Sequence, residues 1–396
     1  MPPNRIRPSR LLALPLELRE EIYQNIFSCP DKDVQVLRTC RQIFSEAQPF
    51  LFKGPLTFAS QYELYEWLET VGPQHLSHVV DVRMCLADVD LSSVLKGNLQ
   101  QPGAFPTYMD LYKHELDNLS VALQKLPNVV NLTIDKPKPT RSRLFQDLYS
   151  RFLHIVGDQW PNLRRLTLND NQVPLAFIQS FPNLRHLCCI GHSSGGDSDA
   201  ASIFSSMPHL AEVELVLWPW MRTSSDRRNS MADLVSNTQA LTSLTLHETQ
   251  NRREMSPAFS IRDIMEALHQ VHLDTLQVLR ITLNSVPDPT TLEALFGFLA
   301  GSSVKHLELV WPEQSSNFVE SLPCSLEVLD VAVFHQQELQ NLKYRLQARR
   351  ADLPVLHKLY IRHYPAPVVN TSQTVRPTPR ACPKSRLTGT RALDAI

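Results

Sequence analysis

The segment from Leu187 to Ser198, LCCIGHSSGGDS, contains residue types and a spacing that could support nucleophilic catalysis. Within it, Gly191, Ser193 and Gly195 match the G-x-S-x-G pattern of a nucleophile elbow, a sharp strand-to-helix turn that exposes a catalytic serine. The apolar run before the pattern predicts a strand, and DSDAASIF after it predicts the start of a helix. The segment therefore raises the hypothesis of a serine hydrolase that uses Ser193.

The sequence around this pattern favours a different origin. FPNLRHLCCIGH, which ends at His192, aligns residue for residue with WPNLRRLTLNDN, which ends at Asn171. The alignment predicts that the elbow-like turn is the loop after one strand of a repeat. An α/β-hydrolase also needs a second loop that supplies oxyanion donors, typically an HGGG-like sequence upstream, and the chain has none. A serine hydrolase is therefore the least favoured function, behind two binding functions that the rest of the sequence indicates.

The composition argues against several classes of function. The 396 residues include 39 Lys and Arg against 40 Asp and Glu, so no global positive field attracts nucleic acid or an anionic membrane. No run approaches the roughly 18 uninterrupted apolar residues of a membrane helix. Only 11 glycines occur, and neither nucleotide-binding glycine pattern is present. We therefore expect no cofactor, no nucleic acid and no membrane among the partners.

Cysteine and histidine usage indicates neither a disulfide framework nor a metal site. The 7 cysteines are odd in number and lack C-x-x-C spacing, which favours reduced thiols and a cytoplasmic or nuclear location. His269 and His272 lie three residues apart in a predicted helix, without further ligands nearby. We therefore expect two surface histidines there, and no metal site in the chain.

A short apolar pattern recurs over residues 76–361. The copy PNLRRLTLNDNQV fits L-x-x-L-x-L-x-x-N through Leu163, Leu166, Leu168 and Asn171, and a second copy, TLQVLRITLNS, ends the pattern at Asn284. Eight looser copies begin at Val79, Val129, Leu184, Leu210, Leu241, Val304, Leu326 and Leu356. The pattern predicts a short strand with alternate residues inward, then an asparagine that bonds the backbone of a neighbouring coil.

Segments with helical periodicity separate these copies, for example LYKHELDNLSVALQKLP, SIRDIMEALHQVH and TTLEALFGFLAGS. Strand followed by helix, stacked repeatedly, predicts the fold class: α/β, as an irregular leucine-rich-repeat solenoid with a parallel sheet on its concave side.

Residues 11–53 predict a separate small module of three helices. Four apolar residues recur at every fourth position: Leu14, Leu18, Ile22 and Ile26. This spacing predicts a first helix over residues 15–27, and two shorter helices are expected over 34–40 and 42–52, with Pro49 kinking or ending the last one. A unit of this size cannot bury every apolar side chain, so it must dock on the rest of the chain or offer an apolar face to a partner.

The sequence of this module resembles the F-box, in the divergent form common in fungal F-box-like proteins. LPLELREEIY, from Leu14 to Tyr23, is similar to the LPxELRxxIY half of that form, and LRTCRQIFSEA, from Leu37 to Ala47, is similar to its LRTCRQIxxEA half. The tryptophan common in the third helix is absent, and Ile43 stands there with a phenylalanine. Placed ahead of leucine-rich repeats, the module looks like that of the substrate receptors of SCF-type ubiquitin ligases.

The resemblance implies a Skp-type adaptor as a partner, and through it a cullin scaffold. The implied adaptor-binding residues are Leu14, Pro15, Leu18, Ile22 and Ile26, with Leu37, Cys40 and Ile43 supporting the later helices. In the alternative hypothesis, residues 11–53 only cap the open end of the solenoid, and the chain is a non-enzymatic scaffold. Both hypotheses describe a binding protein without catalytic activity of its own.

The expected organisation has five parts: a flexible N-terminus at 1–10, the F-box-like module at 11–53, a linker with a capping helix at 54–75, the solenoid at 76–366 and a disordered tail at 367–396. Outward side chains of the predicted strands would bind an unidentified target protein. They are Arg165, Thr167, His186, Glu212, Glu214, His247, Arg280, His306, Glu308, Asp330, Lys358, Tyr360 and Arg362. Their charges alternate in sign and their aromatic area is small, which favours a protein or peptide over a small molecule.

Overall fold

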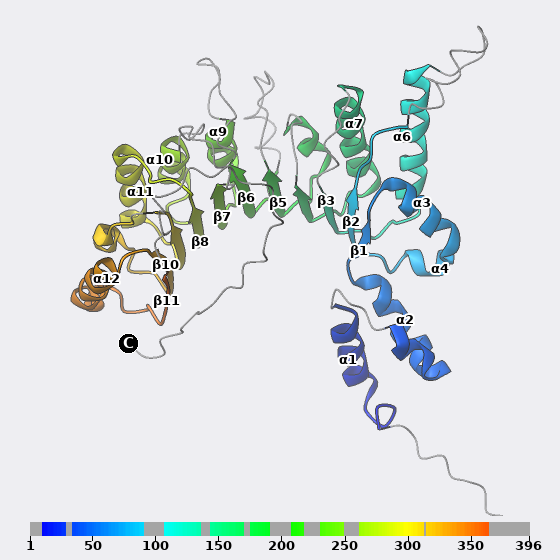
Figure 1. Cartoon of the computed structure of the whole chain (residues 1–396), viewed down its shortest axis with the longest axis horizontal. Helices are drawn as coiled ribbons and strands as arrows, with labels where there is room; N and C mark the ends of the chain where they lie inside the picture. The colour runs from blue at the N-terminus through cyan, green and yellow to red at the C-terminus, as the bar shows by residue number, and fades with distance from the viewer. Residues whose placement is uncertain are drawn as a thin grey trace, which may run out of the picture. The chain divides into compact units, whose positions relative to one another are not determined.

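The structure of the chain is a computed structural model, and it forms two compact units, Met1–Asp197 and Ser198–Ile396 (Figure 1). It describes residues 10–28, 34–90, 107–135, 143–169, 175–190, 207–217, 230–248, 261–312 and 314–363. Ser193, with its elbow-like pattern, lies outside the described residues, as do Asn171, nearly all of the expected flexible N-terminus and the whole of the expected tail.

The first unit begins with the helical module. It consists of α1 (Leu16–Ser28), η1 (Val34–Arg38), which is a 3₁₀ helix, and α2 (Arg41–Lys53). Its buried core is formed by Tyr23, Phe27, Ile43 and Ala47. The thiol of Cys40 caps α2, because its Sγ accepts from the backbone N–H of Ile43 at 3.5 Å. A closed core within so short a segment means that the module has its own packing centre.

Helix α2 passes through Pro49, where the sequence predicts a kink or an end, and continues to Lys53. Proline removes one N–H from the helical ladder. The residues after it are held by packing: Phe50 and Leu51 lie against the module core, and the ring of Phe52 stacks on that of His75 with centroids 5.2 Å apart. These contacts offset the lost hydrogen bond and keep the last turn helical.

The repeats of the first unit start earlier than predicted. Their elements are β1 (Leu56–Phe58), α3 (Gln61–Thr70), α4 (Pro73–Leu76), β2 (Asp81–Cys85), α6 (Tyr108–Gln124), β3 (Asn131–Asp135), α7 (Arg143–Gln159), β4 (Arg165–Leu168), η2 (Leu175–Ser180) and β5 (His186–Ile190). Each strand pairs in parallel with the next one in the sequence, from β1 to β5. The segment 54–75, expected as a linker with a capping helix, thus supplies the first strand as well as two helices.

The second unit has the same construction. Its elements are β6 (Glu212–Leu217), α9 (Ser230–Asn237), β7 (Ser243–Glu248), α10 (Ile261–Val271), β8 (Val278–Thr282), α11 (Pro289–Gly301), β9 (His306–Val310), η3 (Ser316–Ser321), β10 (Val328–Val333), α12 (Gln336–Ala348), η4 (Arg350–Asp352) and β11 (Lys358–His363). The strands β6 to β11 again pair in parallel in sequence order. Because parallel neighbours require a crossover, each strand and its following helix form one coil. Helices α9, α10 and α11 lie side by side along one face of these strands (Figure 1).

The leucines of the repeat pattern form a buried ladder in each unit. Leu132, Leu166 and Leu187 are register partners on β3, β4 and β5, and all three are fully buried. In the second unit Leu244 and Leu279 occupy the same position on β7 and β8. Each of the ten predicted copies contains a strand, so the mixed α/β repeat architecture with parallel strands is confirmed.

The asparagine of the second copy also behaves as predicted. Asn284 follows β8, and its Nδ2 donates to the backbone oxygen of Glu248, at the end of β7, at 2.8 Å. The backbone N–H of Asn284 donates to the Glu248 carboxylate at 2.8 Å as well. Successive coils are therefore joined at the ends of their strands in addition to the ladder itself.

His272 is a core residue and not the surface histidine that we expected. It is fully buried, with its Nε2 2.8 Å from the oxygen of Val235 and its Nδ1 3.0 Å from Oγ1 of Thr275. Burial lowers the pKa of His272, and the hydrogen bond to Val235 only partly opposes this, so the neutral ring donates from Nε2. His269 is exposed, as predicted.

Two helical glycines differ sharply in the space around them. A Cβ at Gly157 in α7 would lie 2.2 Å from the Cβ of Ser180 and 2.6 Å from its carbonyl oxygen, so α7 approaches η2 too closely for a side chain. An ideal Cβ at Gly297 in α11 meets no heavy atom of the described residues within 4 Å.

Gly157→Ala is expected to lower the free energy of unfolding by about 1–3 kcal/mol, because the overpacking exceeds the roughly 1 kcal/mol gained in helix propensity. Gly297→Ala, the matched control, should be neutral or stabilise by up to about 1 kcal/mol. Thermal unfolding followed by circular dichroism measures both. Equal shifts in the two variants would contradict the close packing of α7 on η2.

Candidate protein-binding surfaces

The predicted adaptor-binding residues on and just before α1 differ in their exposure to solvent. Pro15 and Leu18 are exposed, with Leu18 at 47%, and Leu14 and Ile22 are half-buried. Ile26 packs against the module core, so the structure places it with the core and not on the contact surface. The accessible part of the set is therefore Leu14 to Ile22.

The buried residues of α1 are those that directly follow the predicted apolar positions in the sequence. Arg19, Tyr23 and Phe27 are the buried residues of this helix, and they recur with the same four-residue spacing. Leu18 and Ile22 come directly before two of them, so they border the core side and turn away from it. The helix thus carries two stripes: one is buried, and the other packs on the core at Ile26 but is accessible at Leu18.

The residues implied to support the later helices do so in two ways. Leu37 packs against the module core and Ile43 belongs to it, whereas Cys40 is exposed and acts as the cap of α2. Two further apolar residues that the sequence analysis did not single out are exposed: Leu16 at 44% and Phe44 at 45%.

An ionic network joins α1 to α2. The guanidinium of Arg19 donates from Nε to Oε2 of Glu46 at 2.8 Å and from Nη2 to Oε1 at 2.7 Å, and it also donates to the carbonyl oxygen of Leu14. The Tyr23 hydroxyl and the Gln42 amide donate to the same carboxylate at 3.1 and 2.9 Å. Hydrogen bonds from Arg19 and then Gln42 lower the pKa of Glu46 to about 2.

This network accounts for polar residues in both halves of the F-box-like sequence pattern. Arg19 and Tyr23 belong to its first half, and Gln42 and Glu46 to its second. No role is predicted for these four residues from the sequence, although their place in the two halves of the pattern was the available signal. Three hydrogen bonds from Arg19 and Tyr23 of α1 fix this helix to the Glu46 carboxylate of α2, and Gln42 on α2 supports the same carboxylate. The apolar stripe of α1 is thus presented on a rigid frame.

Glu46→Gln should weaken this frame in a pH-dependent way. Because the folded pKa is depressed from 4.5 to about 2, the ionised Glu46 stabilises the module above pH 4.5, and this contribution is lost as the pH falls towards 2. Pepsin, which is active over this range, should therefore cleave the variant within residues 16–53 faster than the wild type at pH 4.5, with the difference vanishing near pH 2.

Glu66→Gln in α3 is the control for this comparison, since Glu66 is exposed and should leave the cleavage ratio at one throughout. A ratio for Glu46→Gln that does not change with pH would show that the carboxylate does not hold the two helices together.

The outer face of the strands, defined as the face opposite the buried leucine ladder, carries the predicted target-binding residues. In the first unit Arg165 is exposed, and Thr167 and His186 are half-buried. The structure pairs Arg165 with His186 in register on β4 and β5, and Thr167 with Cys188, which is buried.

A second group on the outer face of the first unit was not predicted. Nη2 of Arg83 on β2 donates to Oδ1 of Asp135 on β3 at 2.9 Å, and Nδ2 of Asn169, directly after β4, donates to the same oxygen at 2.6 Å. Burial opposes ionisation of Asp135, but the hydrogen bonds from Arg83 and Asn169 prevail and lower its pKa. The negative charge of Asp135 is thus compensated by Arg83 within the sheet.

Four of the predicted charged residues of the second unit form one network. Nε of Arg280 lies 3.6 Å from Oε2 of Glu308, and Nη2 of Arg362 lies 3.0 Å from Oε1 of the same residue. Arg362 also pairs with Asp330. The alternation of sign that the sequence showed is therefore a set of ion pairs across β8 to β11, and most of this charge is already compensated.

The remaining predicted residues of the second unit lie on the same outer face, exposed or half-buried. They are Glu212, Glu214, His247, His306, Lys358 and Tyr360.

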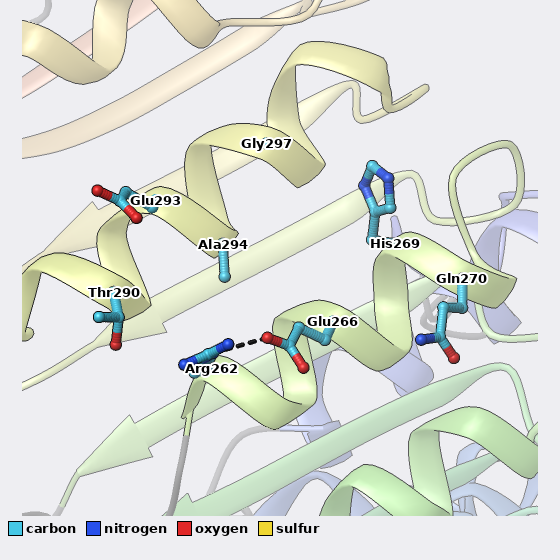
Figure 2. A pocket seen from close by; sticks show the side chains of 8 residues that line it. All are labelled: Arg262, Glu266, His269, Gln270, Thr290, Glu293, Ala294 and Gly297. Atoms are coloured by element: carbon cyan, nitrogen blue, oxygen red, sulfur yellow. Dashed lines mark hydrogen bonds and ion pairs between the residues drawn. The ribbon is translucent and has the colours of Figure 1, made fainter.

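A groove of about 420 Å³ lies between α10 and α11, on the helical side of the second unit. Figure 2 shows Arg262 turned towards Glu266 on α10, with His269 on the same helix, and Gly297 on the facing α11. The ion pair of Arg262 and Glu266 measures 2.6 Å. The groove is lined by Arg262, Glu266, His269, Gln270, Thr290, Glu293, Ala294 and Gly297. Its charges are mixed and partly paired, and the sequence analysis had assigned no site there.

Among the described residues, no group of three or more His, Cys, Asp or Glu side chains is arranged to hold a metal ion. Within the same residues no helix has the length and apolar character needed to cross a membrane.

Comparisons with known proteins give little further information. No family model matches the sequence, and no curated protein matches it. Among solved structures, the chain is similar to an internalin C2 from Listeria monocytogenes, with 14% identity, a TM-score of 0.19, and coverage of 63% of this chain and 71% of that chain. A likeness at this level carries no argument about function, so the repeat architecture rests on the strand register and the buried ladder.

Proposed function

We propose that this chain is the substrate-recognition subunit of an SCF-type ubiquitin ligase. Its helical module binds a Skp-type adaptor, which connects it to a cullin, and the outer face of its repeats binds a target protein. Ubiquitin transfer is carried out by partner subunits, so the chain needs no catalytic residue, cofactor or metal. It accelerates the reaction by holding the target close to activated ubiquitin, in the cytoplasm or nucleus.

The apolar side chains that the helical module leaves exposed are the observation that carries this proposal. Leu18 is 47% exposed and Leu16 44% exposed, although the module core is completed by other residues of the same helix. Phe44 on α2 is 45% exposed in the same way. Three large apolar side chains on so small a module are costly to leave in water, and burial against a partner helix would recover that free energy.

One observation favours the alternative, a scaffold in which the module only caps the repeats. The end of α2 contacts the repeat region: Phe52 stacks on His75 of α4, and the amide nitrogen of Gln48 lies 3.1 Å from Nε2 of His75. These contacts involve the end of α2, whereas the stripe around Leu18 lies on α1. A cap would bury Leu18, which is exposed.

Leu18→Asp separates the two functions. Because Leu18 is exposed, a charge there should leave the melting temperature unchanged. If the side chain is buried against the adaptor, the variant should bind a purified fungal Skp-type adaptor about thirtyfold or more weakly, corresponding to a loss of about 2 kcal/mol. Isothermal titration calorimetry measures the affinity.

Tyr344→Asp is the matched control, since Tyr344 is 76% exposed on α12 of the second unit and lies far outside the module in sequence. It should bind the adaptor like the wild type. A wild-type chain that does not bind the adaptor would leave the scaffold as the function, and general destabilisation by Leu18→Asp would show that the stripe is part of the fold.

A further inference from the structure

Three arginines at the start of β4 and β5 differ from the arginines within the other described strands. Arg165 is the first residue of β4, and Arg164 and Arg185 come directly before β4 and β5; all three are exposed. Within the part of the chain that the structure describes, none of them has an acidic partner. The other arginines of the described strands each pair with an acid: Arg83, Arg280 and Arg362.

The position directly before a strand brings side chains of neighbouring coils together. Before β9 and β10 it holds Lys305 and Glu327, joined by a backbone bond from Glu327 N to Lys305 O of 2.8 Å, and their side chains form an ion pair of 3.5 Å. The backbone bond from Arg185 N to Arg164 O is also 2.8 Å. Two arginines thus occupy the positions that form an ion pair elsewhere in the chain.

The neighbouring groups do not compensate this charge. Arg165 is in register with His186 on β5 and with Asn131 on β3. The residue of the β3 coil that corresponds to Arg164 is Val130, whose oxygen accepts from the N–H of Arg164 at 2.8 Å. No carboxylate therefore faces the arginines from these positions of β3 or β5. Like charges held side by side in this way raise the free energy of the unbound chain, and an anionic ligand would lower it.

We propose that Arg164, Arg165 and Arg185 bind an acidic segment of a partner protein. Guanidinium groups bind carboxylates in a bidentate manner, and strands about 4.8 Å apart with about 3.3 Å per residue place the three within reach of closely spaced Asp or Glu side chains. A nucleic acid would require a basic stripe long enough to follow several phosphates, whereas the next coil offers Val130 and Asn131.

This inference deepens the proposed function, since it rests on that function for the identity of the partner as the ligase target. The arginine surface itself does not depend on adaptor binding. It can therefore be tested on the full chain alone, without any other subunit.

The test is fluorescence anisotropy of the full chain with a short fluorescein-labelled peptide of alternating Glu and Gly, beside a Gln-and-Gly peptide and a single-stranded oligonucleotide. The Glu peptide should bind and the Gln peptide should not, and added NaCl should weaken the binding. Changing all three residues together, Arg164→Glu, Arg165→Glu and Arg185→Glu, should weaken binding at least about tenfold. Arg185→Glu alone should also weaken it while raising the melting temperature, because it recreates the arrangement of Lys305 and Glu327.

The control reverses three arginines that are paired on helices: Arg151, Arg262 and Arg345. It changes the net charge equally and should leave peptide binding within about twofold of the wild type, as expected for distant exposed charges. Failure of the Glu peptide to bind, equal losses in both triple variants, or tighter binding of the oligonucleotide through the same three arginines would overturn the inference. A wild-type chain that binds the Glu peptide but not the adaptor would contradict the proposed function and still support the acidic-segment site.

Discussion

The parallel register between neighbouring coils is the constraint on which the other features depend. Because alternate residues of each strand must be buried, a shift by one residue would expose the ladder of Leu132, Leu166 and Leu187, so the register is fixed. Once it is fixed, every outward side chain has a determined neighbour on the next strand. Charges that are far apart in the sequence become ion pairs, such as Arg280 with Glu308, or like-charged neighbours, such as Arg164 with Arg185.

The helical module follows the same logic on a smaller scale. A single carboxylate on α2, Glu46, accepts hydrogen bonds from Arg19 and Tyr23 of α1, and so sets the angle and the phase of α1 against α2. With that phase the aromatic residues of α1 close the core. Leu18 and its apolar neighbours are left for other contacts. The module thus combines a polar clamp, a small core and an accessible apolar stripe, which suits a docking element better than a simple cap.

Much of the architecture could be predicted from the sequence, because leucine spacing reports directly on strand burial. All ten predicted copies contain a strand, but β1 escaped prediction, since its three residues are too short to show the pattern. His272 was wrongly predicted at the surface, because its two hydrogen bonds satisfy the ring inside the core. The pairing of outer-face charges was not predictable, since it requires the register between strands separated by many residues; the sequence showed alternating signs but not which side chains meet. The adaptor, the target and the absence of catalysis stay predictions.

The central claim is that the apolar stripe of α1 is a docking surface and that the repeats remain free when it is occupied. Hydrogen–deuterium exchange of the full chain, with and without a purified Skp-type adaptor, tests it most directly. We expect added protection confined to residues 14–26 and the part of α2 around Phe44, with unchanged exchange at β4, β5 and β8 to β11. Protection of the repeats with none on α1, or no protection anywhere, would contradict it.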